Sequence, residues 1–247
     1  MTIPLESSVG ALVSERLGRL EVFENFGIDY CCGGSTSLAD SCRLAGCDSQ
    51  EVIAALLESD QQASSAQEVE TTDWRTATLV ELTHHIETKH HEFMKKELPL
   101  IGGLLDKVIS AHGENHPELS EVGKIFVGLR QELEAHLAKE EQVLFPWIQV
   151  MEKTRAIPSR QGSSVNNPIR VMEHEHDNAG EALRSLRAVT DDYAVPADGC
   201  ATYQSLMARL ADMEKDLHEH IHKENNILHP RAAALEASLL NAAAMGS

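Results

Sequence analysis

The feature that most constrains the fold of this chain is a short segment that occurs twice. EAHLAKEEQVLFP at residues 134–146 nearly recurs as LHEHIHKENNILHP closer to the C-terminus. Each copy places a His four residues before a Glu, as His136 before Glu140 and His220 before Glu224. Residues four apart share one face of an α-helix, and a buried Glu is costly unless it is paired or binds a metal. The repeat therefore predicts two helices that each present a His and a Glu to a metal site.

The composition favours helices and excludes some classes of partner. Aromatic residues make up only 4% of the 247 residues, whereas the good helix formers Ala, Leu and Glu are common. The net charge is −18 and no stretch is basic, so we expect neither a nucleic-acid partner nor a membrane partner. No window approaches the roughly 20 apolar residues of a membrane span.

Cysteine and histidine are segregated along the chain. All 13 histidines follow Thr83, whereas four of the five cysteines come early. An odd number of cysteines does not resemble a secreted disulfide framework, and the charged start does not resemble a signal peptide. We therefore expect a cytoplasmic protein. The segregation predicts a small helical Cys-Cys domain at residues 1–60, a flexible linker at 61–72, a helical bundle at 73–236 and a tail at 237–247.

Four long amphipathic helices are predicted after the linker, at residues 73–110, 119–150, 167–190 and 200–228. Asp73 is read as the N-cap of the first helix, and Pro146 as a stop or kink in the second. Modest loops between helices of this length make sequence neighbours antiparallel. The predicted fold class is therefore all-α, an up-down-up-down four-helix bundle preceded by a small helical domain.

The first and third helices are expected to supply the remaining metal ligands. His176 lies near the middle of the apolar face of the third helix, whereas His174 lies to one side. A helical wheel centres the apolar face of the first helix on His90 and includes Phe93 in that face. The internal repeat favours His91 instead, because the His-Glu pair there aligns with the His-Asp pair of the third helix. We choose His91 and keep His90 as the alternative.

The predicted site thus has four imidazoles and two carboxylates: His91, His136, Glu140, His176, His220 and Glu224. Such a donor set suits iron or manganese better than a structural zinc, which takes four ligands and often thiolates. Two bridging Glu would leave coordination positions open for small molecules. The other histidines are predicted to be mostly surface residues, with one or two as hydrogen-bond partners of ligands. Glu141 and Glu175 lie beside ligands and could either substitute for a ligand or hydrogen-bond to one, and we include neither in the predicted site.

Five short motifs along the chain together resemble one known family. They are DYCCGG at residues 29–34, DWR at 73–75, HLAKEE at 136–141, MEHEHD at 172–177 and HIHKENN at 220–226. They resemble the RIC proteins, the di-iron proteins for the repair of iron centres, over nearly the whole chain. A Cys-Cys motif in front of a hemerythrin-like bundle is specific to this family. His229 departs from the pattern, which has an apolar aromatic before the closing proline.

This resemblance implies a hemerythrin-like four-helix bundle and two iron ions joined by oxo and carboxylate bridges, with the same six residues as ligands. It also implies a stress-response protein that repairs iron–sulfur clusters after oxidative or nitrosative stress by supplying iron from a labile centre. The implied partners are damaged iron–sulfur proteins and small molecules such as nitric oxide or dioxygen. A homodimer is left open.

The adjacent Cys31 and Cys32, followed by two glycines, are read as an accessible dithiol with a redox or iron-handling role. Thiolates bind iron, reduce disulfides and coordinate damaged clusters. A working hypothesis is that the pair docks near the di-iron site and that the linker lets it reach a client. Cys42 and Cys47 are predicted to be buried small residues.

Two other functions stay open from the sequence. The first is a redox enzyme that reduces nitric oxide or peroxide at the open metal positions, with the thiols as electron entry. Whether the chain is an enzyme is therefore undecided. The second is a hemerythrin-like sensor or carrier of dioxygen or nitric oxide, which is less favoured because a carrier has no need of a dithiol domain.

Overall fold

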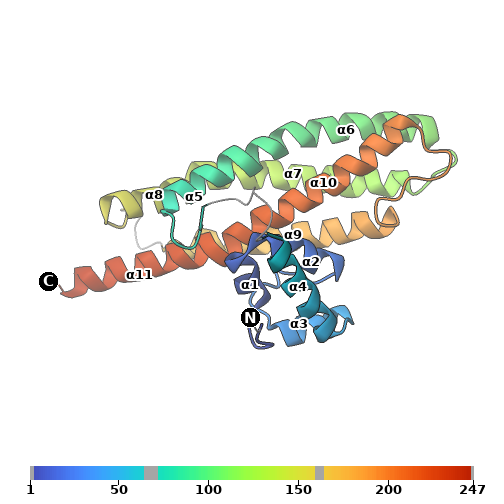
Figure 1. The fold of residues 1–247 in the computed structure, drawn as a ribbon. Helices are drawn as coiled ribbons and strands as arrows, with labels where there is room; N and C mark the ends of the chain where they lie inside the picture. Colours follow the sequence, from blue (N-terminus) through green and yellow to red (C-terminus); the bar gives the residue numbers. More distant parts are fainter. Residues whose placement is uncertain (1–2, 64–71, 159–163, 246–247) are drawn as a thin grey trace. The chain divides into compact units, whose positions relative to one another are not determined.

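A computed structural model describes residues 3–63, 72–158 and 164–245 (Figure 1). Regular structure in these ranges is helical, apart from one isolated antiparallel bridge between Ser8 and Ser37. None of the helices in the described ranges is both long and apolar enough to cross a membrane. The prediction of an all-α fold is confirmed.

The chain divides into two compact units. The first comprises Met1–Leu82 together with Glu219–Ser247, and the second comprises Thr83–His218. The predicted linker at 61–72 begins with the last residues of a helix, and residues 64–71 lie outside the described ranges. The predicted division into four segments therefore stays a prediction.

The first unit contains short helices near the N-terminus and the C-terminal helix of the chain. Ser8 and Ser37 begin two of these helices by accepting the backbone N–H of the third residue after them, at 3.3 and 3.1 Å. Gly46 ends one helix in the left-handed region, with φ 71°. The elements are α1 Val9–Glu15, η1 Leu17–Arg19, α2 Leu20–Asn25, α3 Leu38–Ala45, α4 Ser49–Ala63, η4 Glu224–Leu228 and α11 His229–Met245.

A buried ion pair ties the end of α4 to the start of the first unit. Arg19 donates from Nη2 to Asp60 Oδ2 at 2.8 Å and from Nε to Asp60 Oδ1 at 3.1 Å. The Arg19 side chain is 4% exposed and that of Asp60 is 9% exposed. Arg19 Nη1 also donates to the Leu12 carbonyl at 3.0 Å, so one guanidinium joins three segments.

The second unit contains a four-helix bundle whose consecutive long helices run in opposite directions (Figure 1). Its elements are α6 Glu92–His112, α7 Leu119–Lys139, α8 Phe145–Thr154, α9 Asn166–Val189 and the part of α10 Ala201–Lys223 that ends at His218. The core side chains recur at three- and four-residue spacing along each helix, as in Leu98, Ile101 and Leu105. The predicted up-down-up-down bundle is confirmed.

The predicted start of the first long helix at Asp73 is wrong. Thr78 and Glu81 form a capping box, in which Thr78 Oγ1 accepts the Glu81 N–H at 3.1 Å. Glu81 Oε2 accepts the Thr78 N–H in return, at 2.9 Å. The helix therefore begins as α5 Leu79–Ile86, whereas Asp73 closes a turn by accepting the N–H of Arg75 at 3.0 Å.

Three of the predicted long helices contain a π-helical turn. These turns are η2 Glu87–His91 between α5 and α6, η3 Glu140–Leu144 between α7 and α8, and η4 between α10 and α11. A π turn closes i→i+5 hydrogen bonds and so inserts one residue into the helical register. The buried face of the first helix includes Ile86 before η2 and continues at Met94 after it. Phe93, which was predicted to lie in that face, is only half-buried.

The second long helix continues past Pro146. This proline follows η3 and occupies the first turn of α8, which continues to Thr154. A proline in a first turn costs little, because the missing N–H has no required partner there. The predicted stop at this residue is therefore wrong.

Asp60→Ala should lower the free energy of unfolding of the first unit by about 3 kcal/mol, because the buried Arg19 charge loses its buried partner and keeps Glu15, whose side chain is 53% exposed. Urea unfolding followed by circular dichroism measures the change. The control is Asp40→Ala, which removes an ion pair with Arg43 whose side chains are 53% and 74% exposed. The control should change stability by less than about 1 kcal/mol, and an equal effect of both variants would contradict the role given to burial.

Candidate metal centre

Four of the six predicted ligands lie in the second unit and are buried there. His91 is the last residue of η2, His136 lies near the end of α7, Glu140 opens η3, and His176 lies in the middle of α9. His91 and Glu140 are 0% exposed, His136 is 3% exposed and His176 is 2% exposed. Three separate helices therefore bring metal-binding side chains into one buried region.

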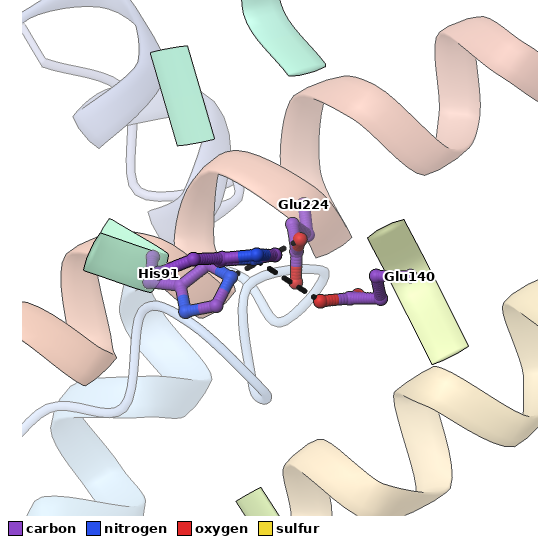
Figure 2. A group of neighbouring side chains, drawn as sticks. His91, Glu140 and Glu224 are labelled. Atoms are coloured by element: carbon purple, nitrogen blue, oxygen red, sulfur yellow. Dashed lines mark ion pairs between the residues drawn. The ribbon is translucent and has the colours of Figure 1, made fainter. Parts of the chain in front are cut away.

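Glu140 lies between two imidazoles. Its Oε2 is 3.4 Å from His91 Nε2, and its Oε1 is 3.4 Å from His136 Nε2. Figure 2 shows the His91 ring and the Glu140 carboxylate directed toward each other. One carboxylate that offers a different oxygen to each of two histidines has the arrangement of a ligand that bridges two metal ions.

His176 extends this arrangement on the His136 side. The two Nε2 atoms are 3.1 Å apart and the ring centroids are 4.8 Å apart. Two groups of ligand atoms that lie within 4.8 Å of one another could each hold a metal ion, and Glu140 belongs to both. His91 belongs to one group, and His136 and His176 belong to the other.

Partly exposed carboxylates fix the outer nitrogens of two of these histidines. His91 Nδ1 lies 2.8 Å from Glu141 Oε1, and His136 Nδ1 lies 2.9 Å from Glu175 Oε2. A carboxylate accepts only, so each Nδ1 carries the proton and each Nε2 keeps its lone pair for a metal. Of the two alternatives for Glu141 and Glu175, these contacts agree with hydrogen bonding to a ligand.

A lysine completes each of these contacts. Lys95 donates to Glu141 at 2.5 Å, and Lys139 donates to Glu175. Burial alone would raise the pKa of both carboxyls, but the hydrogen bonds from the lysine and the histidine outweigh it and lower both pKa values. Both carboxylates are therefore charged at neutral pH.

The structure distinguishes His90 from His91. Both are 0% exposed, but His90 Nδ1 lies 3.0 Å from Asp216 Oδ1 and its ring contacts His85. His91 faces Glu140 and stacks on Phe145, with centroids 5.5 Å apart. The helical wheel favoured His90 because it assumed a continuous α-helix, whereas η2 adds a residue before this point.

The other two predicted ligands, His220 and Glu224, lie in the first unit. His220 Nε2 lies 3.2 Å from Glu224 Oε1, and both side chains are 0% exposed. Glu224 is the first residue of η4, as Glu140 is the first residue of η3. The sequence repeat is therefore also a structural repeat.

Two histidines outside the predicted ligand set are more buried than predicted. His222 is 0% exposed, contacts the Tyr30 ring at 5.8 Å and lies 3.1 Å from Asn226 Nδ2. Burial lowers its pKa to about 4, so it is neutral at pH 7. His229 is 1% exposed. The expectation that most remaining histidines lie at the surface is wrong for these two.

The two adjacent cysteines differ in exposure. Cys31 is 6% exposed and Cys32 is partly exposed, so the dithiol is less accessible than predicted. A hydrogen bond with Cys32 and burial raise the pKa of the Cys31 thiol. Of the two cysteines predicted to be buried, Cys42 is 2% exposed but Cys47 is partly exposed.

Cys200, directly before α10, has a histidine partner that the sequence did not predict. Its Sγ lies 3.2 Å from His112 Nε2. The N–H groups at the start of α10, chiefly that of Tyr203, and the contact with His112 lower the pKa of Cys200 to about 7. A cysteine at a predicted helix start was the available signal, but its histidine partner is 88 residues away.

Alkylation of Cys200 by iodoacetamide should therefore rise with pH through a midpoint near 7 rather than near the ordinary value of 9.0. The thiolate is the reacting form, so the rate follows its fraction. Peptide mass spectrometry of the intact chain, treated at a series of pH values, measures it. His112→Ala should move the midpoint upward, and His116→Ala, which changes a nearby histidine without this contact, should not.

Comparison with known proteins places these features in a family. Residues 82–232 match the Hemerythrin HHE cation binding domain, and residues 5–60 match a domain of unknown function, DUF542. Iron-sulfur cluster repair protein YtfE of Citrobacter koseri is 35% identical over 215 residues, which cover 87% of this chain and 91% of that protein. YtfE of Enterobacter sp. is 34% identical over 231 residues, covering 94% and 98%. The resemblance read from the sequence is confirmed, and the chain belongs to the YtfE family.

Proposed function

We propose that this chain repairs damaged iron–sulfur clusters and that it supplies iron for the repair from a centre of two iron ions. The relatives that cover most of the chain are named iron-sulfur cluster repair proteins. The observation that carries the proposal is the position of Glu140, whose two oxygens each face a different buried histidine. This arrangement lies within the matched cation binding domain.

The donor set supports iron. His91, His136, His176 and Glu140 offer imidazole nitrogen and carboxylate oxygen, the ligand types of non-haem iron. Thiolate is not among them, which argues against a structural zinc site. Iron bound there would supply an exchangeable, redox-active metal.

We assign the remaining two ligand positions to His220 and Glu224. They repeat the spacing of His136 and Glu140, and both are fully buried. A buried carboxylate requires a positive partner, and a metal ion is one that satisfies both residues of the pair. With Glu224 as the second bridging carboxylate, each iron ion would have two histidines.

Residues that contact the ligand histidines from outside hold them in an orientation that suits iron binding. Glu141 and Glu175 orient His91 and His136 so that each Nε2 lone pair faces inward. Lys95 and Lys139 keep these carboxylates charged. The Glu141 and Glu175 side chains are 28% and 26% exposed, so solvent reaches the carboxylates that orient the ligand histidines.

We further propose that Cys31 and Cys32 handle the iron or the electrons that the repair needs. They are free thiols in the DUF542 domain, which precedes the cation binding domain in this chain. A reducing compartment such as the cytoplasm would keep them reduced. The clients in this proposal are damaged iron–sulfur proteins.

A second candidate is reduction of nitric oxide or peroxide at the iron centre. Six protein ligands shared by two ions leave coordination positions for a small molecule, and the thiols could deliver electrons. A sensor of dioxygen or nitric oxide would use the same positions without turnover. Neither alternative requires iron to leave the protein.

The experiment that separates these functions follows labelled iron. The protein loaded with labelled iron is mixed with a damaged iron–sulfur protein and a chelator in the solution. Repair by iron supply predicts that label appears in the rebuilt cluster faster than in the chelator. Retained label with consumption of nitric oxide would instead support the enzyme.

Glu140→Gln should cost the protein most of its iron, because it removes the charge shared by two histidines. Metal analysis of the purified chain measures the loss. The metal-free variant should be as stable as the metal-free parent or more so, since a buried charge has been removed. The control is Glu134→Gln, which changes a carboxylate 51% exposed and paired with Arg130. Normal iron content in Glu140→Gln would contradict the assignment.

Glu175→Gln should weaken iron binding by about ten- to a hundredfold, because His136 then loses the charged acceptor that fixes its Nδ1 proton. Competition with a chelator of known affinity measures it. Glu181→Gln, which changes an exposed Glu on the same helix, serves as control. Equal affinities of the two variants would rule out an orienting role for Glu175.

A further inference from the structure

A second cluster of metal-binding side chains lies in the loop between α2 and α3 of the first unit. Asp29, Cys31 and Cys32 each offer one ligand atom, and these three atoms lie within 4.8 Å of one another. Cys31 is buried, Cys32 is partly exposed and Asp29 is exposed. Solvent therefore reaches the cluster at Asp29 and Cys32.

Asp29 is held against the thiols by the backbone of the loop. Its Oδ1 accepts the N–H of Cys31 at 3.1 Å and the N–H of Cys32 at 3.0 Å. The Cys31 Sγ donates to the same oxygen at 3.4 Å. The second carboxylate oxygen of Asp29 takes no part in these three contacts.

The two glycines that follow the cysteines keep this loop compact. A Cβ at Gly33 would lie 2.8 Å from the Asp29 carbonyl oxygen and 3.3 Å from its Cγ. A Cβ at Gly34 would lie 2.1 Å from Oδ1 of Asn226. Only residues without a side chain allow such close approach.

Asn226 fixes the loop from outside it. Its Nδ2 donates to the carbonyls of Tyr30 and Cys31, at 3.2 Å in each case. The Tyr30 ring packs on His222, which lies one helical turn before Asn226. The backbone that carries both thiols is therefore held in one conformation, which reduces the entropy that a ligand must overcome on binding.

We propose that Asp29, Cys31 and Cys32 form a transit site for one divalent iron ion, with the Asp29 carboxylate as the third ligand beside the two thiols. The inference rests on the proposed function, because it gives the iron a place to bind outside the buried centre. On binding, one Fe²⁺ replaces two thiol protons, which pass to solvent, and no electron is transferred.

The ligand set fits a transient site better than a structural one. Structural zinc takes four protein ligands, whereas this loop supplies three and leaves a position toward solvent. Two sulfurs and one oxygen suit Fe²⁺, which accepts both donor types. The open position is where a ligand from a client protein could take over the ion.

The test uses Co²⁺ as the spectroscopic probe for Fe²⁺ in the full-length, iron-loaded protein. Cys200→Ser is the background, because Cys200 lies beside His112 and could itself bind cobalt. Anaerobic titration should show a thiolate-to-cobalt charge-transfer band that saturates at one equivalent. The band should disappear in a variant with Cys31→Ser and Cys32→Ser.

Asp29→Asn is the decisive variant. Its amide oxygen can still accept the N–H groups of Cys31 and Cys32, so the loop keeps its conformation while the charged ligand is lost. We expect about ten- to a hundredfold weaker Co²⁺ binding. The matched control is Asp48→Asn, since Asp48 accepts the Gln50 N–H at 2.7 Å in a similar turn beside Cys47. The control should bind Co²⁺ normally.

Two results would overturn the transit site: absence of the cobalt band in the parent, or equal affinity in Asp29→Asn and the parent. Either result leaves the buried centre and the iron-transfer experiment unaffected. Conversely, a normal cobalt site together with no transfer of labelled iron would contradict the proposed function but not the transit site. The two ideas therefore fail separately.

Discussion

The structure of the second unit depends on the burial of one carboxylate. Glu140 is 0% exposed, and each of its oxygens lies 3.4 Å from the Nε2 of a different histidine. A buried charge in that position is unfavourable unless positive charge reaches it, and metal ions shared with the facing histidines would supply that charge. The positions of His91, His136 and His176 have a common explanation if the carboxylate and the imidazoles share metal ions. The carboxylates of the Glu–Lys pairs outside the histidines then fix the ring orientation and the Nδ1 proton, so that each Nε2 faces inward.

The π-helical turns place these side chains. His91 ends η2, Glu140 begins η3, and Glu224 begins η4, so each turn has a predicted ligand at its boundary. An inserted residue rotates all that follows on the helix by about one residue's turn, which lets a polar ligand enter the core without moving the apolar face before it. Such turns are rare and are frequently found at functional sites.

In the first unit, contacts of the backbone rather than a buried charge hold the candidate site in place. The motif of residues 29–34 gains a physical explanation for most of its members. Asp29 caps the two cysteines, and the glycines allow Asp29 and Asn226 to approach the backbone. The conformation of the thiol loop therefore depends on a residue almost 200 positions later in the chain.

The sequence by itself determined the helical class and the bundle and predicted five of the six candidate ligands, because periodicity along a helix shows which residues share a face without tertiary information. Its internal repeat also chose His91 where the helical wheel chose His90. Only the tertiary structure showed why the helical wheel was wrong. A π turn changes the backbone hydrogen-bond pattern, and local helix propensity does not predict that change. The tertiary structure also decided the partners of Glu141, Glu175, Asp29 and Cys200. Those partners come from other elements or from loop geometry, and residue order does not specify which distant side chains meet.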